Sequence, residues 1–112
     1  LGAAHSCANP LTAYFHVVHG EAVGVMLPHI IRFNSALPEI ASIYESYFDG
    51  DLADRVSELL WEASMPRSIS NYGVTDADLP KLAEMAAKQW TAQFNPRIPT
   101  AEDFRHLYAG IV

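Results

Sequence analysis

The stretch AHSCANPLTAYFHVVHGEAVGVMLPHIIRFN, residues 4–34, holds four of the five histidines and the single cysteine of this chain. Its first part is rich in alanine and leucine and predicts a helix over residues 1–15. Pro10 has no N–H for the carbonyl of Ser6, so we expect this helix to be kinked or divided there. From residue 18 to residue 33, apolar side chains surround most of the helix circumference, which predicts a central, buried second helix.

The rest of the chain continues the helical pattern. Apolar spacing predicts further helices over residues 38–47, 52–63, 75–93 and 101–110. Thr75 and Thr100 each precede an aspartate by three residues, which is typical of a capped helix start. Residues 95–99 contain two prolines and therefore form an extended connection. With no strand pattern, the sequence predicts an all-α, bundle-like domain of about six helices over residues 1–112.

Composition limits the classes of function. Half of the residues are hydrophobic and 18% are charged, as in a folded globular chain. The net charge of −6 makes nucleic acid and anionic membranes poor partners, and no apolar run is long enough for a membrane helix. A single cysteine suits the reducing cytoplasm. Because the chain begins without methionine inside a helix-like pattern, we expect a piece truncated at its N-terminal side.

The histidines could be ordinary packing residues or half of a metal site. In one straight helix, His5 and His19 would lie about 21 Å apart, too far to share an ion. A break between them, at Pro10 or at the stiff residues before His19, could bring the two rings together. His16 and His19 are also spaced to face one another on a helix. Two histidines alone fall short of a catalytic metal site, which usually has three protein ligands.

The run HSCANPLTAYFHVVHGEAVGVMLPHIIRFN strongly resembles the signature of the iron-containing (group III) alcohol dehydrogenases. The later segments NYGVTDADLPKLAEMAAKQW and NPRIPTAEDFRHLYAG resemble the closing helices of the same family. The resemblance covers essentially the whole chain. It corresponds to the later part of the family's helical domain, which is of the dehydroquinate synthase-like kind, in a larger protein with a separate α/β nucleotide-binding domain.

This resemblance implies a function and a set of site residues. It implies hydride transfer between a small alcohol or aldehyde and NAD or NADP, with His5 and His19 as ligands of Fe²⁺ or, less typically, Zn²⁺. The other two metal ligands and most of the coenzyme site would lie in the missing part, and the enzyme would form homo-oligomers. Asn9 stands where the family has a further histidine near the nicotinamide and the alcohol. His29 would then be structural and His106 a surface residue.

Two alternatives stay open. One is a zinc-dependent relative of the glycerol dehydrogenase or dehydroquinate synthase type, since neutral imidazole binds either metal. The other is a non-catalytic helical fragment that self-associates. In that fragment the loss of covering elements would expose apolar surface around residues 1–15, and such a surface usually finds a partner.

Overall fold

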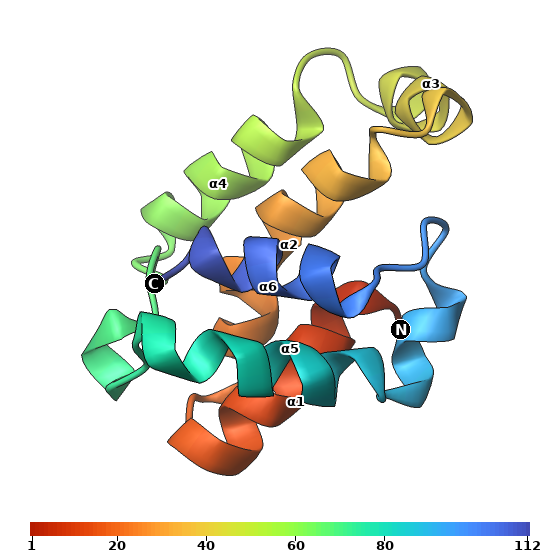
Figure 1. Cartoon of the computed structure of the whole chain (residues 1–112). Helices are drawn as coiled ribbons and strands as arrows, with labels where there is room; N and C mark the ends of the chain where they lie inside the picture. Colours follow the sequence, from red (N-terminus) through yellow and green to blue (C-terminus); the bar gives the residue numbers. More distant parts are fainter.

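The computed structural model describes residues 1–112 and is entirely helical, with no strand (Figure 1). The α-helices are α1 (Ala3–Phe15), α2 (His19–Asn34), α3 (Pro38–Tyr47), α4 (Leu52–Glu62), α5 (Leu79–Ala87) and α6 (Ala101–Ala109). Three 3₁₀ segments lie between them: η1 (Ser70–Tyr72), η2 (Asp76–Asp78) and η3 (Trp90–Phe94). The prediction of an all-α fold with about six helices is confirmed.

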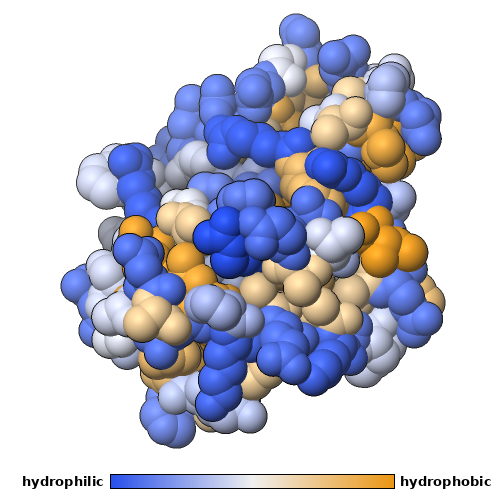
Figure 2. Space-filling model, in the orientation of Figure 1, coloured by the Kyte–Doolittle hydropathy of each residue, from blue (hydrophilic) through white to orange (hydrophobic).

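The core lies between four of these helices. A cluster of 21 buried residues joins α1, α2, α5 and α6, together with the ends of the connecting segments. Helix α2 packs against α1, α4 and α6, as expected of a helix that is apolar on most sides. None of the helices combines the length and the apolar character needed to span a membrane. On the face shown in Figure 2, apolar residues form separate patches among hydrophilic ones.

Helix α1 differs in part from what the sequence predicts. Of the two expected effects of Pro10, a kink or a division, the division does not occur, since the helix runs without interruption from Ala3 to Phe15. Most of its apolar side chains are buried, and Cys7 and Leu11 completely so, whereas Tyr14 is 57% exposed and Leu1, just before the helix, is 70% exposed. The chain's own helices α2 and α5 cover most of α1, so the predicted exposed apolar surface around residues 1–15 is limited to side chains at the two ends of this segment.

The segment predicted as one helix over residues 75–93 is broken into three. The first part is η2 and the second is α5, which is capped at Lys88. Gln89 is extended, and the third part, η3, begins after it. The break brings η3 onto α1, where the Thr91 hydroxyl lies 2.7 Å from that of Ser6. Local sequence favours helix here, and these long-range contacts override it. The connection over residues 95–99 is irregular, as expected.

Helix α3 stands apart from the other helices. It has no buried residue, and Figure 1 shows it at one corner of the molecule, beyond the end of α2. Its Tyr44 hydroxyl accepts a hydrogen bond of 3.2 Å from the Asn34 side chain, which ties it to the end of α2. Two of its apolar side chains, Ile43 and Tyr47, are 50% and 88% exposed.

Candidate metal centre

The turn between α1 and α2 positions the first two histidines. His16 ends α1 in the left-handed conformation, with φ of 56°, a region in which histidine is enriched among residues other than glycine. The N–H groups of His16 and Val17 both point to the Leu11 carbonyl, and Val17 is buried. The chain therefore folds back along α1 before α2 begins at His19.

This turn brings the His19 ring to His5. The two ring centroids lie 5.5 Å apart, and the ring planes are tilted by 52°. Two imidazoles that bind one ion at about 2.0–2.1 Å in tetrahedral geometry have centroids roughly 5 Å apart. The pair thus fits a shared divalent ion, and the expectation that a turn brings the rings together is confirmed. Their role as ligands stays a prediction.

The electrostatic surroundings favour the neutral form of His5. Partial burial, then the neighbouring His19 and the N-terminal amine, lower the pKa of His5 below its usual range. A metal ion binds the unprotonated nitrogen, so a lowered pKa reduces the competition from protons near neutral pH.

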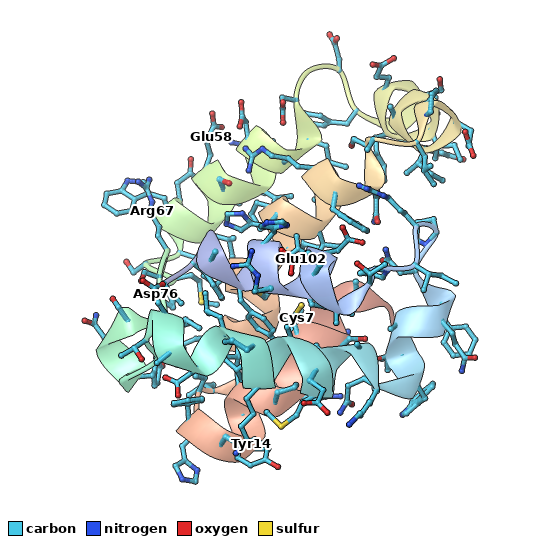
Figure 3. All side chains as sticks on the ribbon, in the orientation of Figure 1. Cys7, Tyr14, Glu58, Arg67, Asp76 and Glu102 are labelled. Carbon is cyan, nitrogen blue, oxygen red and sulfur yellow. The ribbon has the colours of Figure 1, made fainter.

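The other candidate donors lie away from this pair. Nowhere in the chain do three or more His, Cys, Asp or Glu side chains gather in a metal-binding arrangement. Cys7 points into the bundle interior, where burial strongly raises the pKa of its thiol (Figure 3). His106 is an exposed residue 3.4 Å from Glu102, in agreement with the expected surface position. A complete metal site on His5 and His19 therefore needs ligands from outside these residues.

His29 has a packing role at the opposite end of α2. Its ring lies directly against Gly110, where an added Cβ would come within 3.0 Å of two ring atoms. It also lines a cavity of about 560 Å³ between α2 and α4, which includes neither His5 nor His19. This position agrees with the expected structural role of His29.

Asn9 lies one helical turn after His5, and residues four apart share a helix face. Its side-chain Nδ2 donates a hydrogen bond of 3.0 Å to Oε1 of Gln89. Gln89 gives no signal in the sequence, because the local pattern predicts that this residue lies inside a continuous helix over residues 75–93. Only the break after α5 turns the Gln89 side chain to Asn9, and no local sequence signal marks that break.

Several known proteins are similar in sequence to this chain. The model of the Fe-containing alcohol dehydrogenase family, C-terminal, matches residues 1–112. Lactaldehyde reductase of Escherichia coli (strain K12) is 30% identical, with 96% of this chain and 32% of that protein aligned. The 1,3-propanediol dehydrogenase of Klebsiella pneumoniae is 34% identical, with 96% and 31% aligned.

A solved structure shows the same fold. The crystal structure of a 1,3-propanediol oxidoreductase superposes with a TM-score of 0.83 at 30% identity, covering 100% of this chain and 33% of that one. The chain thus spans about a third of the length of the relatives it matches. It belongs to the Fe-containing alcohol dehydrogenase family and corresponds to the C-terminal helical domain of that family.

Proposed function

We propose that this chain is the metal-binding C-terminal part of an NAD- or NADP-dependent alcohol dehydrogenase that interconverts small alcohols and aldehydes. The observation that carries this proposal is the pairing of His5 and His19, 5.5 Å apart between ring centroids, in a chain that the family model matches from end to end. The names of the relatives support small alcohols and aldehydes as the substrate class.

Each proposed site residue has a distinct task. His5 and His19 would hold Fe²⁺, or Zn²⁺ as the second choice, through neutral imidazole nitrogens. When bound, the ion supplies Lewis-acid polarisation of the substrate oxygen. Asn9 hydrogen-bonds the substrate from the same face of α1. Because an amide has no basic pKa near neutrality, Asn9 orients the substrate and does not take up its proton.

The remaining parts of the proposal concern what surrounds this chain. A preceding part of the enzyme would bind the coenzyme and supply the other metal ligands. Residues 1–112 would form one helical domain of that enzyme. Exposed apolar side chains on or after η3, namely Trp90, Phe94 and Ile98, would be covered by that part or by a second subunit of a homo-oligomer. The buried, unpaired thiol of Cys7 suits the reducing cytoplasm.

Metal titration of the 112-residue chain tests the histidine pair. We expect Zn²⁺ or Co²⁺ to bind weakly, near one ion per chain, because two imidazoles leave the ion held mainly by water. His5→Ala and His19→Ala should each abolish this binding. His106→Ala is the matched control, since that histidine is exposed on α6, and it should bind like the wild type. Unchanged binding in His5→Ala or His19→Ala would exclude the proposed metal site.

A further inference from the structure

The start of helix α2, which carries His19, is exposed. Val17 and Ala22 are buried on either side of it, but residues 18–20 lie at the surface. Val18 is the N-cap of α2, and its side chain makes no capping hydrogen bond with the first turn. The free N–H groups of a first helical turn need such a partner from elsewhere. The position of His19 therefore depends on contacts from outside α2.

Tyr72 supplies such a contact. Its hydroxyl donates a hydrogen bond to the Glu21 carboxylate, and this is the only side-chain hydrogen bond that residues 16–22 make. Because a carboxylate only accepts, the direction of this bond is fixed. The bond raises the pKa of the Tyr72 hydroxyl and the backbone N–H of Val18 lowers it, so the hydroxyl lies close to both groups. Val18 and Glu21 stand on the two sides of His19 in the sequence.

Tyr72 is itself fixed in the fold. Its N–H donates to the Ile69 carbonyl at 3.0 Å, and the Ile69 N–H donates to the Ile111 carbonyl at 2.8 Å. Ile69 and Val74, on either side of η1, are buried, and Tyr72 packs against the core. The hydroxyl is thus presented to α2 from a segment that is anchored on both sides.

The distance between the two histidines tolerates little movement of α2. Their ring centroids lie 5.5 Å apart, and both imidazole nitrogens must lie about 2.0–2.1 Å from a shared zinc ion. We propose that Tyr72 is a positioning residue for His19: its hydroxyl fixes the exposed start of α2 through Glu21 and so holds His19 at the separation from His5 that a shared ion needs. This inference rests on the proposed function of the histidine pair.

Metal titration of the 112-residue chain tests this role. Tyr72→Phe removes the hydroxyl and keeps the ring and the net charge. We expect the Kd for Zn²⁺ or Co²⁺ to rise by up to about tenfold, the equivalent of one hydrogen bond. Tyr44→Phe is the matched control, because Tyr44 also bonds to a side chain of α2, but at Asn34, the last residue of that helix. Unchanged affinity in Tyr72→Phe, or the same loss in both variants, would overturn the inference.

Two neutral substitutions of Glu21 separate the hydrogen bond from the charge. Glu21→Gln keeps an acceptor for the Tyr72 hydroxyl, whereas Glu21→Leu, of similar size, does not. Both remove the same negative charge. We expect Glu21→Leu to bind metal more weakly than Glu21→Gln while Tyr72 is present, and the two to bind equally in a Tyr72→Phe background. Equal binding with Tyr72 present, or the same difference in both backgrounds, contradicts the positioning role.

A third readout needs no metal. In the metal-free chain, the nuclear Overhauser contact between the ring protons of His5 and His19 should weaken in Tyr72→Phe and persist in Tyr44→Phe. If it is unchanged in Tyr72→Phe while His5→Ala and His19→Ala abolish metal binding, the inference fails and the proposed function stands. If it weakens but both alanine variants still bind metal, the proposed function fails and the positioning role for a metal ligand fails with it.

Discussion

At the scale of single residues, a side chain from another helix bonds to the backbone of α1 close to its proline. A proline leaves the carbonyl four residues earlier without its usual partner and crowds the preceding turn. The Tyr108 hydroxyl on α6 donates a hydrogen bond of 2.7 Å to the Cys7 carbonyl in this turn. Tyr108 is completely buried, and burial raises the pKa of its hydroxyl far above the usual range. The helix that carries His5 is thus tied to α6 at the level of its proline.

Removal of this hydroxyl should destabilise the fold. Tyr108→Phe removes one buried hydrogen bond to the Cys7 carbonyl while the ring still fills the same space. We expect the free energy of unfolding to fall by about 0.5–1.5 kcal/mol. Urea denaturation followed by circular dichroism measures this change. Tyr47→Phe is the control, because Tyr47 is 88% exposed, and it should unfold like the wild type. A Tyr108→Phe variant as stable as this control would show that the hydrogen bond contributes nothing.

His29 makes the stability of the chain depend on pH. Burial, and then the nearby Arg32, lower the pKa of His29 below the value of about 6.5 for an unfolded histidine. Between these two pKa values the unfolded chain binds more protons than the folded one, so stability falls as the pH falls through this range. Asp54 and Glu58 line the same cavity, and Asp54 pairs with Arg32.

Comparison with His29→Gln isolates the histidine from these neighbours. Between pH 7 and pH 5, the variant should lose less unfolding free energy than the wild type, whatever its absolute stability. Urea denaturation at several pH values measures both slopes. Equal slopes for the two proteins would contradict the assigned role of His29.

At the scale of the elements, periodicity predicted helix positions well and helix ends less well. Residues 38–47 were predicted as a helix with the bounds that α3 has, because Pro38 marks its start. The break at Lys88 and Gln89 was missed, since Ala86, Ala87 and Lys88 all favour helix and no glycine or proline follows them directly. What ends α5 is distant in sequence: Ser6 and Ala3 on α1 bond to Thr91 and Asn95. The same distant contacts created the Asn9–Gln89 pair.

Helix α3 should be the least stable of the long elements. It buries none of its residues, and a side-chain hydrogen bond between Asn34 and Tyr44 links it to the rest of the fold. Regions with few buried contacts open locally at low free-energy cost. Hydrogen exchange followed by mass spectrometry should show peptides within residues 38–47 exchanging well before those of α2, whose Met26 and Ile30 are buried. Equal protection of the two helices would mean that α3 is covered by another surface.

At the scale of the whole molecule, the fold was predictable and the site only in part. The fold depends on apolar helix faces that the spacing of residues in the sequence predicts. These faces pack together in one cluster of 21 buried residues. The histidine pair was suggested by the family-like run and needed only a local turn, which His16 and Val17 provide. The rest of a catalytic site could not be predicted from these residues, because they supply only two of the three ligands that a catalytic metal usually needs.

A complete core together with an incomplete metal site predicts how the 112-residue chain behaves alone. A single buried core should give one cooperative unfolding transition, yet the chain should not reduce NAD or NADP when supplied with an alcohol and Fe²⁺ or Zn²⁺. The two histidines hold an ion too weakly, and the matched relatives are about three times as long as this chain. Absorbance at 340 nm measures the reaction, with a complete 1,3-propanediol dehydrogenase as the positive control. Turnover by the chain that disappears in His5→Ala would show that these 112 residues, alone or as an oligomer, already form a complete active site.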